Sequence, residues 1–222
     1  IDQDRRACHT FGAVAVLDAR WKEHPTSQYF FELQENGRVY KSQTYDSVTT
    51  TLDVSISEGV MEMAIEVLRD SKGDQFMVYG ISQEPFTNTS FSSASNSWLI
   101  EAYTGKIRRN NENIGYDDHF RPATEDTFKM KVDMNEGCLY YALQGESWTE
   151  LVSGITGTVS FAVGSCSSRV SVRLQSVTSY ESVSPGNDCA LFTPLAGAHL
   201  LTRSRKGGEK ITSDRYVSIS KE

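Results

Sequence analysis

The sequence has 222 residues and a formal net charge of −7 at pH 7. With 38% hydrophobic residues it can form one large domain or two small ones around a substantial core, which excludes wholesale disorder. Its acidity argues against a nucleic-acid-binding surface. No apolar stretch approaches the roughly 18–20 residues that span a bilayer, so we expect no membrane insertion. The first residue, Ile1, indicates a fragment of a longer chain.

The first predicted elements form a hairpin around Asn36 and Gly37. Asn-Gly is a strong short-range hairpin signal, and here it separates strands predicted over residues 29–34 and 38–42. Further along, Leu52, Val54 and Ile56 alternate with polar residues. Strict alternation indicates a strand with one buried face, so we predict a strand over residues 52–56.

Residues 61–68 present a conflict between composition and periodicity. Met, Glu, Ala and Leu favour a helix, but the apolar residues at 61, 63, 65 and 67 alternate strictly. Because packing commonly overrides a weak local preference, we predict a strand. The triplet Lys72, Gly73 and Asp74 is then expected to turn the chain, as in the first hairpin, into a strand over residues 76–81.

Later segments repeat the same two-residue period. The alternating sets are Phe128, Met130, Val132 and Met134; Val159, Phe161 and Val163; and Val170, Val172 and Leu174. About fourteen strand candidates and no convincing helix predict an all-β protein, a bent antiparallel two-sheet β-sandwich.

A shift in composition marks a boundary near residue 181, and the boundary near residue 59 is implied by the family resemblance of the block that begins there. Residues 59–180 are predicted to form the core of the sandwich, with residues 1–58 supplying N-terminal strands that pack on it. Residues 181–222 are predicted to be an extension in which strands over 198–202 and 215–220 flank a basic turn at 203–210. Residues 199–222 hold six Lys or Arg against three acids, and the basic turn is interpreted first as a solvated turn, with a partner-binding patch as the alternative.

Catalytic and metal-binding patterns are not found in the sequence. Four cysteines, at positions 8, 138, 166 and 189, form no C-x-x-C pair, and the four histidines show no metal-binding spacing. Asp117, Asp118 and His119 are interpreted as a polar loop rather than a metal site. We therefore expect no enzymatic activity, no cofactor and no metal. Free thiols in a chain with its own core favour a reducing compartment, so a cytoplasmic location is predicted.

The block from Gly59 to Val177 resembles the SPRY domain family. The most specific string runs from Asp126 to Gly145, where Asp133 and Gly137 bracket a tight turn and Leu139 follows. The other matching pieces are Gly59 with residues 61–67, residues 78–82, Ser97 with Trp98, Gly105, and the closing strand pair 159–163 and 170–174. The resemblance implies a concanavalin-like sandwich.

The resemblance also implies a function. SPRY domains generally act as recognition parts of larger proteins, among them ubiquitin-ligase substrate adaptors, and they bind peptides or protein surfaces through loops at one end of the sandwich. The implied site here combines residues 82–97, a long polar loop, with the turn at residues 164–168. Its candidate partner-binding residues are Gln83, Phe86, Thr87, Phe91, Ser165 and Cys166.

Two other functions remain open at this point. The same architecture serves carbohydrate recognition elsewhere, so a lectin-like domain is the first alternative. The second is a structural subunit whose surface is buried in a large complex. Fold alone does not choose among these.

Overall fold

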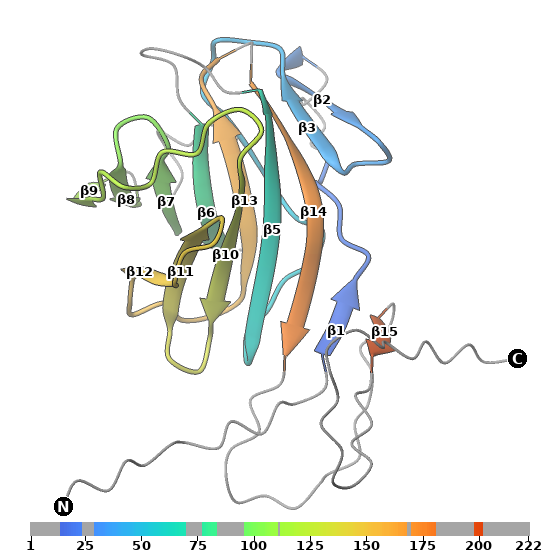
Figure 1. The fold of residues 1–222 in the computed structure, drawn as a ribbon, viewed down its shortest axis with the longest axis vertical. Helices are drawn as coiled ribbons and strands as arrows, with labels where there is room; N and C mark the ends of the chain where they lie inside the picture. The colour runs from blue at the N-terminus through green and yellow to red at the C-terminus, as the bar shows by residue number, and fades with distance from the viewer. Residues whose placement is uncertain are drawn as a thin grey trace, which may run out of the picture.

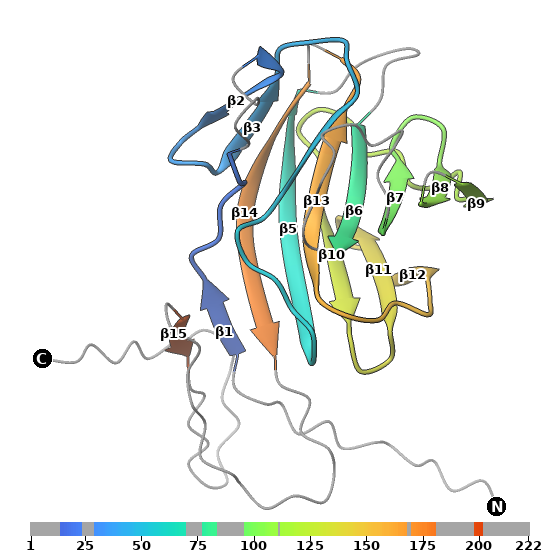
Figure 2. The ribbon, with the colours of Figure 1, turned by 180° about the vertical axis from the view of Figure 1, so that it is seen from behind.

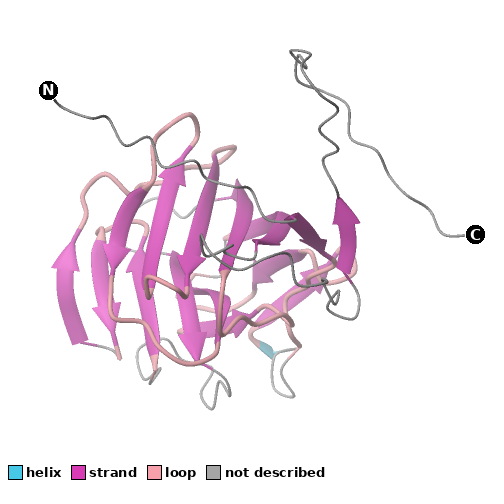
Figure 3. Ribbon diagram, turned by 90° about the horizontal axis from the view of Figure 1, so that it is seen from below, coloured by secondary structure: helices cyan, strands magenta, loops and turns pink. Residues whose placement is uncertain are grey.

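The computed structural model describes residues 14–23, 29–69, 77–83, 96–110, 112–167, 170–180 and 198–201. Within these ranges the chain forms fifteen strands and no α-helix, arranged as two antiparallel sheets that pack face to face (Figures 1 and 3). The predicted all-β sandwich is confirmed.

The first sheet has nine strands. They are β1 (Val14–Leu17), β2 (Phe31–Gln34), β3 (Val39–Ser42), β5 (Val60–Arg69), β10 (Thr127–Asp133), β11 (Cys138–Leu143), β12 (Thr149–Val152), β14 (Ser171–Tyr180) and β15 (Ala198–Leu201). Their order is β12-β11-β10-β5-β14-β1-β15, and the β2–β3 hairpin joins through the pairing of β3 with β14. The turn of that hairpin is at residues 35–38, as the Asn-Gly signal predicts.

The second sheet has six strands. They are β4 (Val48–Thr51), β6 (Met77–Gln83), β7 (Ser97–Glu101), β8 (Lys106–Arg109), β9 (Glu112–Tyr116) and β13 (Val159–Ser165). Their order is β4-β13-β6-β7-β8-β9, so β4 and β9 are the two edge strands, and Figure 2 shows β9 at the outer limit of the sheet. All seven residues of β13 are buried, although its sequence predicts a half-buried strand, because this central strand is covered on both faces.

Strand β5 resolves the conflict over residues 61–68. Met61, Met63, Ile65 and Val67 are buried and their neighbours are half-buried, so the alternation describes the structure and the helix propensity does not. The strand pairs along its length with both β10 and β14. Two-sided pairing satisfies the backbone polar groups that a helix would satisfy internally.

Two predicted elements are wrong. Residues 52–56 do not form a regular strand: β4 ends at Thr51, and Leu52 and Ile56 each make an isolated bridge, to Trp21 and Val159. Leu52 and Ile56 lose solvent exposure because the segment that contains them runs toward β13. The Leu52 amide donates to the Phe161 carbonyl at 2.9 Å. The predicted hairpin of β5 with β6 is also wrong, because these strands belong to different sheets.

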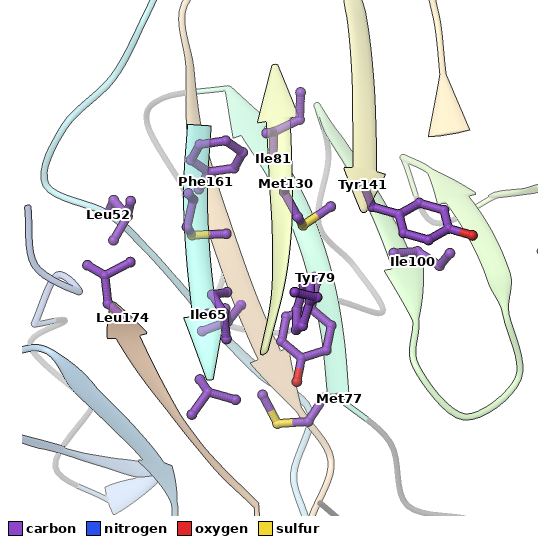
Figure 4. Close-up of a cluster of buried hydrophobic side chains, with 14 of the residues drawn as sticks. Leu52, Ile65, Met77, Tyr79, Ile81, Ile100, Met130, Tyr141, Phe161 and Leu174 are labelled. Atoms are coloured by element: carbon purple, nitrogen blue, oxygen red, sulfur yellow. The ribbon is translucent and has the colours of Figure 1, made fainter. Parts of the chain in front are cut away.

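The core lies between the sheets (Figure 4). Ile65, Met130, Tyr141 and Leu174 come from the first sheet and meet Tyr79, Ile81, Ile100 and Phe161 from the second. Phe120 closes one side, with its ring in edge contact with Tyr79, Phe128 and Tyr141 at centroid distances of 4.9–5.9 Å. Edge-to-face pairs of this kind add to the stabilisation from burial alone.

The predicted N-terminal strands are integral to both sheets, since β1 and β3 pair with β14 and β4 pairs with β13. In the C-terminal extension, β15 pairs with β1. The second predicted strand, residues 215–220, and the basic turn at 203–210 lie outside the described residues.

Candidate functional site

The antiparallel pairing of β6 with β13 decides where the predicted site residues lie. Gln83, the last residue of β6, is opposite Val159, the first residue of β13, and Ser165 is opposite Met77. Six residue steps at about 3.3 Å each separate the two ends by about 20 Å. The expectation that Gln83 and Ser165 share one surface is therefore wrong.

Gln83 and Ser165 both have structural contacts. The Gln83 side-chain amide donates to the Thr156 carbonyl and ties the end of β6 to the segment before β13. Ser165 is completely buried, and its hydroxyl is hydrogen-bonded to the Tyr40 hydroxyl at 3.0 Å, which links the two sheets. A buried hydroxyl in such a contact is not available to a partner. Phe86, Thr87 and Phe91 lie outside the described residues.

Cys166 is half-buried and follows β13 directly. Several other connections reach the same end of the second sheet, which we call the β13 end: residues 43–47, 102–105 and 116–118 together with Cys166. The register places them there, because Val48 pairs with Ser165, Glu101 pairs with Val78, and the Asp117 amide donates to the Gly105 carbonyl at 2.7 Å. Six strands at about 4.8 Å spacing make this end about 24 Å long.

Three tyrosines are exposed along the β13 end. Tyr45 is 57% exposed, Tyr103 is 50% exposed and Tyr116 is 64% exposed. Sequence reasoning missed all three, because a tyrosine next to a turn residue has no feature that separates it from buried tyrosines such as Tyr40 and Tyr141. Exposed aromatic side chains on rigid strand ends are the residues that most often anchor protein interfaces.

A buried carboxylate fixes the turn that carries Tyr103. Glu101 is almost fully buried and accepts hydrogen bonds from Thr104 Oγ1 and from Arg108 Nε, both at 2.5 Å. The Gly105 amide then donates to the Glu101 carbonyl at 2.8 Å. Because the charge of Glu101 is paired and hydrogen-bonded, its burial is tolerated and the turn is held in one conformation.

The segment that follows Tyr116 is fixed in the same way. The Asp117 carboxylate accepts hydrogen bonds from the Tyr141 hydroxyl at 2.8 Å and from the His119 amide at 2.9 Å. Burial and the Asp117 carboxylate raise the pKa of Tyr141 to about 12. Asp117 and His119 therefore help to position a loop. Within the described residues no cluster of three metal-ligating side chains is found.

A separate hollow of about 530 Å³ lies on the first sheet beside Lys129, Gln144, Glu146 and Trp148. Trp148 is 36% exposed, and the Lys131 ammonium lies 5.1 Å from its ring centroid and 4.3 Å from that of Tyr140. The hollow thus combines an aromatic ring with polar hydrogen-bonding groups.

The arrangement of strands matches solved structures. The SPRY domain of human HERC1 superposes with a TM-score of 0.57 and 17% sequence identity, covering 65% of this chain and 96% of that domain. The TRIM65 PSpry domain superposes with a TM-score of 0.51 and 13% identity, covering 70% of this chain and 91% of that domain. The chain has the SPRY-domain fold. No protein-family model matches the sequence, and no curated protein matches it.

The SPRY-fold comparison establishes the architecture, whereas the location of the site is inferred from the geometry of this chain. The predicted sandwich of the resemblance is confirmed, including the Gly137 turn: Gly137 has a φ of +65°, and the Asp133 carboxylate accepts hydrogen bonds from the Asn135 and Glu136 amides. In the described part of the chain, no helix has the length and apolar character needed to cross a membrane.

Proposed function

We propose that this chain is a non-catalytic protein-interaction module that binds a peptide or protein surface at the β13 end. The observation that supports this proposal is the row of exposed tyrosines on rigidly held turns. Tyr103 follows a strand end fixed by Glu101, and Tyr116 ends a strand fixed through Gly105. Pre-organised aromatic anchors reduce the entropy that binding costs.

The wider setting is part of the same proposal. The module would act within a larger adaptor or scaffold protein, with substrate recognition for a ubiquitin ligase as one such role. Cys138 and Cys166 are both free thiols, which supports a reducing, cytoplasmic location. Phe86, Thr87 and Phe91 stay predicted partner-binding residues, but Gln83 and Ser97, on either side of their loop, are at the end of the sheet opposite the β13 end, so they are not part of this proposed site.

The proposal is tested by site-specific photo-crosslinking in cells. A photo-reactive amino acid replaces Tyr45 or Tyr103 at the β13 end, and in a matched control it replaces Thr158, which is exposed just before β13 begins at the opposite end. We expect the same partner to be captured from positions 45 and 103 and not from position 158. Capture from position 158 alone would place the interface at the other end and overturn the proposal.

A second candidate function is carbohydrate binding in the hollow beside Trp148. An exposed indole flanked by amide, carboxylate and ammonium groups is suited to stack on a sugar ring and bond its hydroxyls. The test is a titration of neutral oligosaccharides followed by the fluorescence of the wild type and of Trp148→Ala. A saturable change that requires Trp148 supports this function, and no response from any sugar rejects it.

A further inference from the structure

The outer edge of the second sheet carries a strand that is exposed on nearly all of its residues. β9 is the last strand of that sheet, and Figures 1 and 2 both show it at the lateral limit of the molecule. Its residues Glu112, Asn113, Ile114 and Tyr116 are exposed. Ile114, at 49% exposure, and Tyr116 are two of the largest exposed apolar side chains among the described residues.

The backbone of β9 offers unpaired hydrogen-bonding groups on that side. The Asp117 amide is bonded to Gly105 on the side of β8, and successive residues of a strand direct their N–H and C=O groups to opposite sides. The N–H and C=O of Tyr116 therefore point away from β8. No described strand lies on that side. Such an edge is a template for pairing with another extended chain.

The usual protection against edge pairing is weak here. β9 contains no Lys and no Pro, which are the residues that commonly block an edge. A register shift between Ile107 and Arg108 leaves Ile114 as an unpaired bulge residue in the middle of β9, which disfavours edge pairing there, and regular pairing resumes at Lys106 and Tyr116. The β12 edge of the first sheet has a buried Val152 and, like β9, one exposed acidic residue, Glu150.

The charges around β9 indicate which chain would pair with it. Glu112 begins the strand, and Asp117 and Asp118 follow its end, with Asp118 79% exposed in its side chain. Of the nearby cations, Arg108 is paired with Glu101 and Arg109 lies over the Trp98 ring, whereas Arg121 contacts Asp118 at 3.6 Å and partly neutralises it. Lys106 remains beside Tyr116, one strand further from the edge.

Acidic groups at both ends of β9 disfavour a second copy of this chain. An antiparallel pair of β9 strands would bring Glu112 of each copy close to Asp117 and Asp118 of the other, and like charges at such positions are destabilising. A partner strand that alternates apolar and basic residues would instead place opposite charges next to one another. Its apolar side chains cover Tyr116, and its cations lie beside the acids.

We propose that β9 binds an extended segment of a partner protein as an added strand of about five residues, with apolar and basic residues in alternation. This inference rests on the proposed interaction function and specifies its binding mode. The added strand continues the second sheet and ends next to Tyr103 and Tyr116, so it is contiguous with the β13 end.

The experiment uses immobilised hexapeptides that alternate apolar residues with lysine, with glutamate or with serine, probed with the labelled full chain. We expect the lysine set to bind at least tenfold more tightly than the glutamate set. N-methylation of alternate backbone amides of a binding peptide should abolish binding in one register and leave it unchanged in the other. Equal binding of the lysine and glutamate sets, or indifference to N-methylation in both registers, would overturn the proposal.

Protein variants locate the contact. Glu112→Lys combined with Asp118→Lys should weaken binding of the lysine peptides about tenfold, whereas Glu150→Lys on β12 should leave it unchanged. A concentration-dependent dimer that Ile114→Lys abolishes would identify a second copy as the occupant and overturn the proposal. If the peptides fail to bind β9 while crosslinking from positions 45 and 103 succeeds, the interaction function stands and the added strand falls. If the peptides do not bind and crosslinking from positions 45 and 103 captures no partner, both proposals are overturned.

Discussion

The two edge strands of the six-stranded sheet, β4 and β9, differ in how far other segments of the chain cover them. All four residues of β4 are buried, and residues 20–22 cover its free side: the Lys22 amide donates to the Thr51 carbonyl, and the Thr50 hydroxyl donates to the Lys22 carbonyl, both at 2.8 Å. β9 has no such cover among the described residues. The β4 edge is thus part of the hydrophobic core, whereas the β9 edge is an exposed surface that neighbouring segments hold in position. The predictions below test this division.

The largest effect is expected at the covered edge. Leu52 is completely buried, bridges to Trp21 and donates its amide to Phe161. Leu52→Ala leaves a cavity between the two sheets and should lower the free energy of unfolding by about 2–5 kcal/mol. Chemical denaturation provides the measurement. A loss below about 1 kcal/mol would show that this edge is not part of the core.

The second effect concerns the attachment of β9. Gly105 has a φ of +68°, and a Cβ there would lie only 2.1 Å from the Asp117 carbonyl oxygen. Gly105→Ala should therefore cost about 2–4 kcal/mol, from backbone strain together with the displacement of Asp117.

Gly145→Ala is the matched control for Gly105→Ala. Gly145 has a φ of +81°, and its Cβ would meet nothing within 4 Å, so it reports the strain alone. We expect a cost of about 1 kcal/mol there. Equal losses in the two variants would show that the close contact with Asp117 does not hold β9 in place.

The third effect appears at alkaline pH, near the covered edge. Burial raises the pKa of Tyr40 to about 12 from an ordinary value of 10. Below pH 10 both the folded and the unfolded state keep this proton, and between pH 10 and 12 the unfolded state loses it first. Stability should therefore decline over this window, by up to about 3 kcal/mol from this residue.

Urea unfolding at several pH values measures this decline. In Tyr40→Phe the loss of stability between pH 10 and 12 should be smaller than in the wild type, although Tyr141 still contributes. An unchanged slope in Tyr40→Phe would mean that this hydroxyl ionises equally in both states.

The smallest effect is expected at the open edge. Ile114 is exposed, so Ile114→Ala should change the free energy of unfolding by less than about 0.5 kcal/mol. The same variant should weaken any partner that pairs along β9. A loss of stability comparable to that of Leu52→Ala would show that this side chain is buried in solution and that the two edges are equivalent.

The sequence predicts the local elements well, because their causes are local. The alternation over residues 61–67 describes how β5 is buried, and Asp133 with Gly137 describes a turn whose hydrogen bonds and positive φ the structure shows. The Asn36-Gly37 hairpin follows from turn chemistry in the same way. These predictions needed no knowledge of what lies opposite each strand.

Apart from the strand expected over residues 52–56, the errors concern pairings between distant segments. A period of two shows which side chains of β5 and β6 are buried, but both sheets bury one face in the same core, so the pattern does not reveal that the strands lie in different sheets. The expectation that Gln83 and Ser165 share one surface was wrong for the same reason. Whether Gln83 lies near Ser165 depends on the direction of β6 relative to β13, and no residue type in either strand encodes that direction.

The pairing of β5 with β14 has a consequence for the order of events during synthesis. Ser171 pairs with Arg69 and Tyr180 with Val60, so the partners are more than a hundred residues apart. At about 5–20 residues per second, a ribosome needs roughly 5–20 s to complete β14 after β5 has been made. Throughout that interval Met61, Met63, Ile65 and Val67 lack one of the two strands that flank them. The nascent chain therefore exposes apolar residues of an incomplete sheet. Chaperone binding to β5 at this stage would protect it from aggregation.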